Sequence, residues 1–225
     1  WAKKIKFKSY SNYQTPSKIV ELPNGDIVLL LFLQNDTAIN LFKLKNDGSF
    51  VWAKSVSGMN GEYFNTCNLF SYQNDLYVSC ASIPDIGADA GNFQNSIIKL
   101  DDNGNIVWSR YYGQNYECFN ATSVGLLVNN DSLIVFGRMW AAGCKDPTIG
   151  FPDRERTYFG MKVNKFNGAL GKSVSYTSPR ELAPTGQSGA YTYTFTNTGN
   201  NNLFFSTRFY NLSSKKYGSY KVNFD

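Results

Sequence analysis

The sequence predicts an all-β protein folded as a four-bladed β-propeller, in which each blade is a four-stranded antiparallel sheet. Three observations carry this prediction. Short apolar or aromatic runs alternate with pairs such as Asn-Gly and Asn-Asp, a hairpin motif recurs roughly every 50 to 60 residues, and no segment keeps a helical period over three turns. Repeated units of four short strands are typical of propellers.

The recurring hairpin motif places a Trp nine residues after a Lys, with Asp-Gly or Asn-Gly between them. Its two clear copies are KLKNDGSFVWAKSVSG (residues 43–58) and KLDDNGNIVWSRYYG (residues 99–113). A weaker copy over residues 162–176 lacks the Trp. Each copy predicts two strands joined by a tight turn.

A second hairpin precedes each copy of the motif or, in the last cycle, the closing strand. Apolar runs flank a turn pair in four segments, and we expect primed two-residue turns there. These segments are residues 18–33, 68–80, 124–137 and 193–206. With the Trp motif, they give four cycles of four strands.

The two ends of the chain carry the two halves of the Trp motif. Residues 1–7 (WAKKIKF) match its second arm, and residues 220–225 (YKVNFD) match its first arm. We expect the Trp strand to be the outer strand of each blade. The ring then closes by pairing of the N-terminal strand with the C-terminal blade or with a neighbouring unit, which removes an exposed sheet edge. Residues 1–225 form a single domain on this interpretation, as one unit of a longer tandem-repeat chain.

The hairpin KLDDNGNIVWSR (residues 99–110) resembles the LD-x-x-G-x-x-x-W hairpin of PQQ-like and secreted bacterial surface β-propeller repeats. The resemblance covers most of the chain as four blades and is specific for blade architecture. It implies that Trp1, Trp52 and Trp108 dock between blades. No residues match a quinone site, so we expect no cofactor.

Composition narrows the classes of function. The chain has no histidine, which removes Ser-His-Asp catalysis and nearly all zinc sites. The net charge of +5 comes without a basic run, so nucleic acid is not an expected partner. No run of 18 apolar residues is present, so no transmembrane segment is expected.

The four cysteines flank two of the predicted hairpins almost symmetrically. Cys67 and Cys80 each lie six residues outside the turn at residues 73–74, and Cys118 and Cys144 lie twelve and thirteen residues outside the turn at residues 130–131. Directly opposed residues of neighbouring strands have Cα separations that a disulfide spans. We therefore predict the pairs Cys67–Cys80 and Cys118–Cys144; the other two connectivities and free thiols are the alternatives. Disulfides would place the protein in an oxidising, extracellular compartment, secreted or at the cell surface.

Four N-x-S/T sequons mark candidate glycosylation sites, at Asn35, Asn120, Asn130 and Asn211. The alternative is that these are turn-forming asparagines. Asp85 and Asp89 are weak calcium candidates, because their loop lacks the spacing and the terminal Glu of an EF-hand; no other metal site is expected.

These features favour a non-catalytic protein over an enzyme. The first hypothesis is an extracellular glycosylated structural repeat of a surface fibre, surface layer or adhesin, with neighbouring copies and covalent glycans as partners. The second is a secreted propeller that binds carbohydrate or protein on its long-loop face. An enzyme is the least favoured, because the paired acids Asp153 and Glu155 fit a solvated salt-bridge loop better than glycoside hydrolysis.

Overall fold

The computed structural model consists of antiparallel β-sheets throughout the residues that it describes. These are residues 18–32, 37–58, 63–83, 94–112, 119–129, 131–141, 156–177, 193–197, 202–210 and 215–223. The chain divides into two compact units, residues 1–116 and 117–225, and each unit is treated by itself. Within these ranges no helix is long and apolar enough to cross a membrane.

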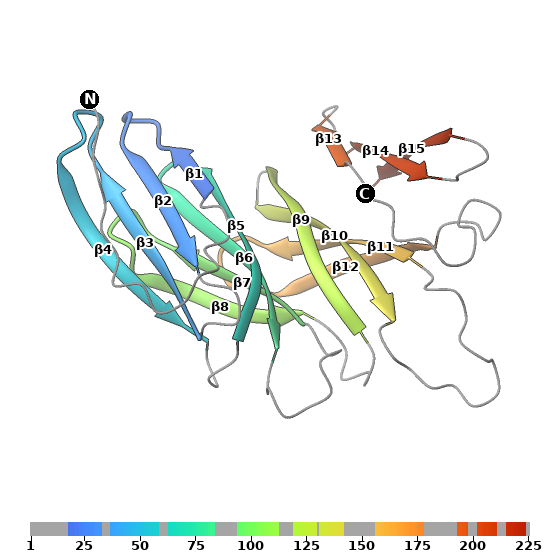
Figure 1. Ribbon diagram of the computed structural model, residues 1–225, viewed down its shortest axis with the longest axis horizontal. Helices are drawn as coiled ribbons and strands as arrows, with labels where there is room; N and C mark the ends of the chain where they lie inside the picture. The colour runs from blue at the N-terminus through green and yellow to red at the C-terminus, as the bar shows by residue number, and fades with distance from the viewer. Residues whose placement is uncertain are drawn as a thin grey trace. The chain divides into compact units, whose positions relative to one another are not determined.

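The first unit contains two four-stranded sheets, each an antiparallel meander whose spatial order follows the chain (Figure 1). The first sheet consists of β1 (Lys18–Glu21), β2 (Ile27–Phe32), β3 (Ala38–Leu44) and β4 (Phe50–Ser57). The second consists of β5 (Tyr63–Tyr72), β6 (Asp75–Ile83), β7 (Gln94–Leu100) and β8 (Ile106–Tyr112).

The second unit contains a four-stranded sheet and a three-stranded sheet with the same meander order. The four-stranded sheet consists of β9 (Phe119–Asn129), β10 (Ser132–Ala141), β11 (Arg156–Asn164) and β12 (Leu170–Thr177). The three-stranded sheet consists of β13 (Tyr193–Asn197), β14 (Asn202–Tyr210) and β15 (Lys215–Asn223).

The expected all-β class with four-stranded antiparallel sheets is thereby confirmed. β4 and β8, the strands that carry Trp52 and Trp108, form an edge of their sheets. The predicted partner of the C-terminal sheet, residues 1–7, lies outside the described residues. Four blades, a closed ring and a single domain therefore stay predictions.

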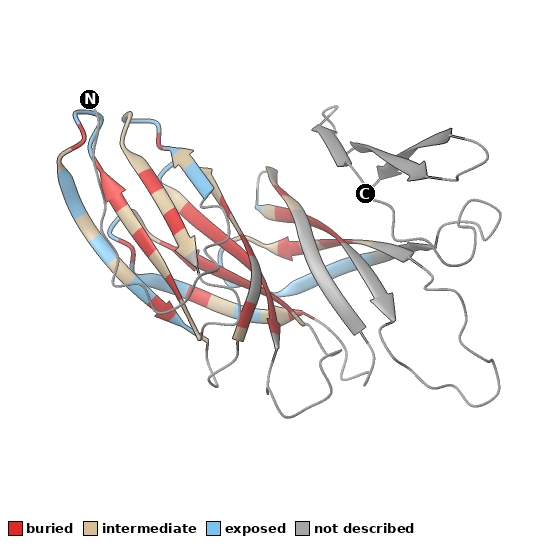
Figure 2. Cartoon of the chain, viewed as in Figure 1, coloured by how far each residue is buried: buried red, intermediate tan, exposed pale blue. Residues whose placement is uncertain are grey.

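Burial explains why these segments form strands. β3 alternates between buried and half-exposed residues, as expected for a strand with one face in a core, whereas β7 is buried along nearly its whole length. β4 is largely exposed, which fits its place at the edge of the sheet (Figure 2). Inner strands such as β3 and β7 are therefore more buried than the edge strand β4.

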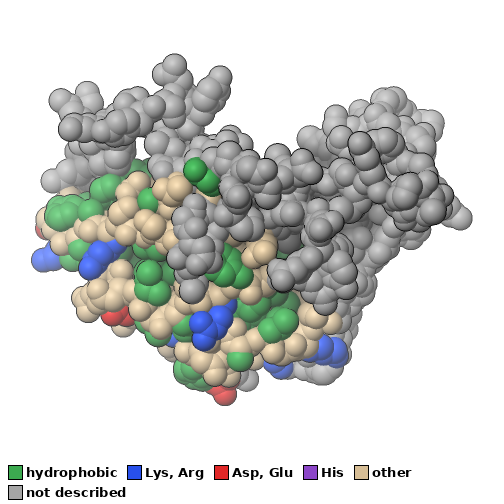
Figure 3. Space-filling model, turned by 90° about the horizontal axis from the view of Figure 1, so that it is seen from below, with side chains coloured by type: hydrophobic (Ala, Val, Ile, Leu, Met, Phe, Trp, Pro, Cys, Tyr) green, Lys and Arg blue, Asp and Glu red, His purple; other side chains and the backbone are tan. Residues whose placement is uncertain are grey.

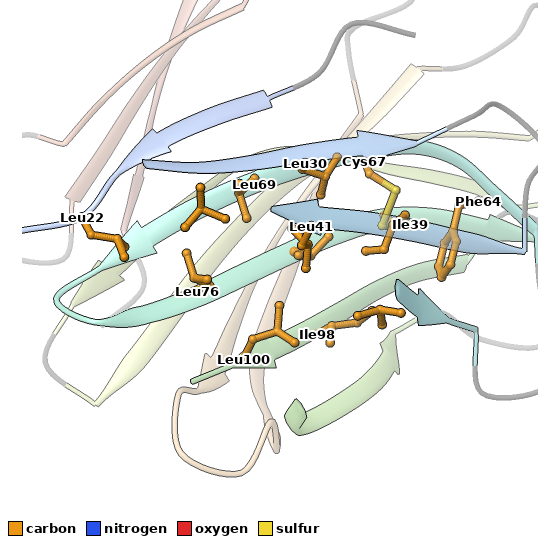
Figure 4. Packing of buried hydrophobic residues seen from close by; sticks show 14 residues of the cluster. Leu22, Leu30, Ile39, Leu41, Phe64, Cys67, Leu69, Leu76, Ile98 and Leu100 are labelled. Carbon is orange, nitrogen blue, oxygen red and sulfur yellow. A yellow bond between two sulfur atoms is a disulfide. The ribbon is translucent and has the colours of Figure 1, made fainter. Parts of the chain in front are cut away.

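The core of the first unit lies between its two sheets. Strand β5 contacts β1, β2 and β3 of the first sheet. Leu30 and Leu41 of the first sheet and Leu76 and Ile98 of the second belong to one cluster of buried side chains (Figure 4). Full burial of a Leu or Ile side chain contributes roughly 1.5–3 kcal/mol each, so this cluster is the main source of stability for the pair of sheets.

The predicted two-residue connections are present where Tyr72 pairs with Asp75 and where Asn129 pairs with Ser132, whereas the connection at Asn24-Gly25 is longer. At Asn24-Gly25, Gly25 N–H donates to Leu22 O, Leu22 N–H donates to Asp26 O, and Gly25 has a φ of +83°. The same pattern closes the turns that contain Gly48 and Gly104. This is the longer hairpin loop in which a turn is followed by a left-handed glycine, and it fits the strand twist equally well.

The Cys67–Cys80 disulfide is confirmed, and it joins directly opposed residues of β5 and β6. The two Cα atoms are 4.2 Å apart, a separation typical of a pair between non-hydrogen-bonded positions. Both cysteines are buried in the core cluster, close to Ile39 and Phe64 in Figure 4. Cys118 and Cys144 lie outside the described side chains, so their pairing stays a prediction.

Loss of this disulfide should destabilise the first unit. Closing a loop with a sequence separation of 13 residues restricts the unfolded chain by about 3 kcal/mol. Urea unfolding of a Cys67→Ala/Cys80→Ala variant is expected to show a loss of that size, and reduction of the wild-type protein should give a shift at least as large. Overlapping curves for the variant and the oxidised wild type would contradict this assignment.

Candidate functional site

The turn between β7 and β8, residues 101–105, is held against the first sheet by Trp52. The indole Nε1–H of Trp52 donates to the backbone oxygen of Asp102 at 3.0 Å. Beside it, Lys54 Nζ lies 3.3 Å from Asn105 Oδ1. The Trp therefore fixes the neighbouring sheet by one hydrogen bond and by ring contact with the turn.

Gly104 is the residue of this turn that the ring contacts. It has a φ of +74°, and a Cβ atom added there would lie 3.1 Å from Trp52 Cη2 and 2.9 Å from Lys54 Cγ. Both the backbone conformation and the close approach therefore require glycine. The Asn103-Gly104 pair of the repeat therefore has a packing role as well as a turn role.

Lys43 adds a buried ion pair to the same contact. Its side chain is only 4% exposed, and its Nζ lies 2.5 Å from Asp102 Oδ1 and 3.2 Å from Asp26 Oδ2. A buried ammonium group without partners would be strongly unfavourable, so the two carboxylates are required to keep Lys43 in place. Asp26 comes from the same sheet and Asp102 from the next one.

The second sheet repeats the Lys–Asp pair. Lys99 Nζ lies 2.7 Å from Asp75 Oδ2. In both sheets the Lys faces a Trp across the ladder, and the Asp stands two residues before the strand partner of the Lys. Sequence reasoning missed this pairing, although an Asp directly after each turn pair, as in NGD and QND, is its signal.

Asp101 organises the turn from inside. Its side-chain oxygens accept from the backbone N–H of Asn103 and Asn105 and from the side-chain amide of Asn105. Burial opposes ionisation, but these hydrogen bonds outweigh it, so the pKa of Asp101 lies below its ordinary value. The charged form of Asp101 therefore stabilises the turn, and this contribution is lost as the pH falls through the lowered pKa.

Gly25 and Gly104 allow the cost of steric contact to be distinguished from the cost of backbone strain. Gly25 also has a positive φ, but a Cβ there would lie 3.5 Å from its nearest neighbour, which is ordinary contact. Gly25→Ala should cost about 1–2 kcal/mol of stability through the left-handed backbone alone. Gly104→Ala should cost roughly 2–4 kcal/mol, because overpacking against Trp52 is added. Chemical denaturation measures both, and equal losses would show that the ring contact is unimportant.

Tyr77 and Tyr112 are buried tyrosines of the second sheet. Burial raises the pKa of both phenols well above the ordinary value, and the nearby Asp75 carboxylate adds to the shift at Tyr77. The Tyr77 hydroxyl donates to Asp75 Oδ2 at 3.3 Å, and Lys99 lies over the Tyr77 ring at 5.7 Å from the centroid. Both phenols thus stay neutral in the folded protein.

These raised pKa values predict sensitivity to alkali. In the unfolded chain the phenols ionise above about pH 10, so folding stability is complete below that pH and falls as the pH rises beyond it. Thermal melting between about pH 8 and pH 11 should show this fall, and a Tyr77→Phe/Tyr112→Phe variant should show a shallower one. The same slope in both proteins would count against the assignment.

The described carboxylates all lie at the tight-turn end of their sheets. Each stands in, or directly beside, a connection from an odd-numbered strand to the following even-numbered one: Glu21, Asp26, Asp47, Asp75, Asp101, Asp102 and Asp131. Asp26, Asp75 and Asp102 are in ion pairs. No cluster of three metal-ligating side chains exists among the described residues.

The remaining ten carboxylates lie outside the described residues: Asp36, Glu62, Asp85, Asp89, Glu117, Asp146, Asp153, Glu155, Glu181 and Asp225. In sequence, all except Asp225 stand between an even-numbered strand and the next odd-numbered one. In an antiparallel meander those strand ends lie at the end of the sheet opposite the tight turns. The two sets of carboxylates are therefore divided between the two kinds of connection.

The candidate residues named from sequence fall partly within the described chain. Trp108 is buried in β8, and Asn120 is a strand residue of β9 that pairs with Trp140. The others lie outside the described residues: Trp1, Asn35, Asp85, Asp89, Cys118, Asn130, Cys144 and Asn211. Glycosylation, calcium binding and the proposed partners stay predictions. On the face shown in Figure 3, the described Lys and Arg side chains are spread out rather than gathered in one patch.

Comparisons with known proteins give a fold and no family. No family model and no curated protein matches the chain. The α-L-arabinanase of Penicillium chrysogenum, solved with arabinobiose, has a TM-score of 0.58 at 15% identity, covering 92% of this chain and 62% of its own. The GH93 α-L-arabinofuranosidase of Fusarium graminearum, also solved with arabinobiose, has a TM-score of 0.56 at 14% identity, covering 87% of this chain and 56% of its own.

This likeness shows that the chain has a propeller-type fold. It does not support the PQQ-like repeat family, because the matching structures are of a different kind. The chain spans about three fifths of the length of the solved structures that it matches.

The expectation of a non-catalytic structural repeat, or of a binding module, is corrected by the same finding. The solved structures that this chain resembles include glycoside-acting enzymes. The expectation used the repeats, which describe the scaffold and carry no information about a site placed on it. It also relied on the lack of histidine. Glycoside hydrolysis by two carboxylates does not need a histidine, so this lack does not exclude it.

Proposed function

We propose that this chain is a carbohydrate-active β-propeller that hydrolyses arabinose-containing oligosaccharides or polysaccharides. The observation that carries the proposal is the extent of the structural likeness: 92% of this chain is covered by an arabinanase solved with arabinobiose. Glycoside hydrolysis is also the chemistry that the composition permits, since it requires two carboxylates and no histidine, metal or cofactor.

The division of the carboxylates supports this proposal. The carboxylates at the tight turns are largely occupied as turn acceptors and ion-pair partners, as at Asp101 and Asp26. Nine further acids stand in the even-to-odd connections. Loops on a rigid scaffold are the usual carriers of catalysis, so a catalytic pair would come from this second set.

The Cys67–Cys80 disulfide supports an extracellular compartment. Stable structural disulfides are typical of oxidising compartments. Polysaccharides of this type are encountered outside the cell, so secretion or display on a cell surface is part of the proposal.

Hydrolysis of linear arabinan and binding of arabinobiose by calorimetry test the function. Glu62→Gln, Glu117→Gln, Glu155→Gln and Glu181→Gln variants should include at least one with turnover reduced by about three orders of magnitude or more at unchanged melting temperature. Asp47→Asn, at a tight turn, is the matched control and should keep full turnover. A folded protein that neither cleaves arabinan nor binds arabinobiose would refute the proposal.

We also propose that residues 1–7 supply the fourth strand of the β13–β15 sheet. WAKKIKF begins with the same WAK as residues 52–54, which pair with β3 through Lys43↔Trp52. Lys221 occupies the position of Lys43 in its own ladder, because Val222 pairs with Leu203 as Leu44 pairs with Ile27. The corresponding register places Trp1 opposite Lys221 and Lys3 opposite Ser219.

Cysteine cross-linking tests this register. A Lys3→Cys/Ser219→Cys variant should form an intramolecular disulfide, detectable by peptide mass spectrometry. A Lys4→Cys/Ser219→Cys variant is the control, because a shift of one residue points the side chain to the other face of the sheet. Dimeric cross-links would indicate pairing with a neighbouring copy instead, and equal yields from both variants would refute the register.

A further inference from the structure

At two equivalent positions, the second sheet has buried polar side chains and the first sheet has aliphatic ones. Lys43 and Lys99 hold the same position in their sheets, since each faces a Trp. Four residues before these lysines stand Ile39 in β3 and Asn95 in β7. The first sheet therefore has an apolar residue where the second has Asn95.

The neighbouring strand shows the same exchange. Two residues after the strand partner of each Lys stand Leu30 in β2 and Ser79 in β6. Leu30 and Ile39 belong to the core cluster of the first unit. Ser79 and Asn95 are equally buried, at 0% and 1% exposure. Two polar side chains thus replace two core residues without any gain in exposure.

Ser79 and Asn95 contact each other but leave one donor over. Ser79 Oγ donates to Asn95 Oδ1 at 3.2 Å. The amide nitrogen Nδ2 of Asn95 has no hydrogen-bond acceptor among the described residues. A buried amide donor without an acceptor is destabilising, and native proteins rarely keep one unless it has a partner outside the polypeptide.

The contrast with the opposite face of the same strand is clear. Ser96, the next residue, is also buried, but its hydroxyl donates to the backbone oxygen of Cys80 at 3.3 Å. A buried polar side chain in β7 can therefore have its hydrogen-bond donor paired. At Asn95 the oxygen of the amide is bonded, and the nitrogen is left to bind an acceptor.

The place of Asn95 in the sheet agrees with a ligand role. Asn95 is the second residue of β7, so it lies at the end of the sheet where the chain passes from an even-numbered to an odd-numbered strand. The proposed catalytic carboxylates belong to connections of this kind. A donor here lies at the same end of its sheet as the loops expected to hold a sugar.

We propose that Asn95, positioned by Ser79, binds one hydroxyl oxygen through its Nδ2–H group. The oxygen comes from a sugar hydroxyl or from an ordered water molecule, and both accept a hydrogen bond in the same way. The sugar source rests on the proposed carbohydrate function, whereas the water source does not. Breaking an apolar pattern inside a repeat is the kind of local exception expected at a functional position.

High-resolution crystal structures of the wild-type protein, grown without and with arabinobiose, test the proposal directly. An oxygen atom within hydrogen-bond distance of Asn95 Nδ2 is expected in at least one of them. A sugar oxygen at this position identifies the carbohydrate, and a water in both crystals identifies a hydration site. Well-resolved density without any oxygen near Nδ2 in either crystal would overturn the proposal.

Calorimetry with arabinobiose separates the two sources in solution. A Ser79→Leu/Asn95→Ile variant restores the residues of the first sheet and removes both polar groups together. With a sugar ligand its affinity should fall at least tenfold, and with a water ligand the affinity should stay that of the wild type. Ser96→Ala is the control and should bind normally. If the wild type binds no arabinobiose, the carbohydrate function fails, but a crystallographic water on Asn95 would still support the site.

Discussion

The contact between the β7–β8 turn and the first sheet is the constraint on which the first unit depends. Trp52 reaches from an edge strand to the backbone of Asp102, Gly104 admits the ring, and Lys43 is buried between Asp26 and Asp102. The apolar cluster beneath is non-directional and would tolerate sliding of one sheet over the other. The hydrogen bond and the ion pair are directional, and they specify one alignment of the two sheets.

This constraint also explains how the charges are used. Carboxylates in these sheets have structural roles. Asp75 pairs with the buried Lys99, and Asp101 accepts hydrogen bonds within its turn. The acids of the even-to-odd connections lie outside the described residues. The described carboxylates thus stabilise the tight-turn end of the sheets, and catalysis is proposed for the other end.

The error about function came from treating the scaffold as the whole protein. Repeated hairpins, sequons and cysteines describe how a secreted propeller is built, and the same scaffold supports enzymes. The proposed activity rests on different features: the carboxylates that the sequence places in the even-to-odd connections, and the buried polar pair at Ser79 and Asn95. The polar pair appears only when equivalent positions of the first two sheets are compared residue by residue.

The sequence by itself determined the strands, their grouping into cycles and the Cys67–Cys80 pair, because alternation, turn pairs and hairpin symmetry are local properties of the chain. It predicted the edge position of Trp52 because a long loop, which can cross to the next sheet, follows the Trp strand. It did not determine the loop type at Gly25 and Gly104, since two-residue and longer glycine turns share the same residues. Only the tertiary structure decided that Lys43 bonds Asp102 at a separation of 59 residues, because such a contact depends on how two sheets pack.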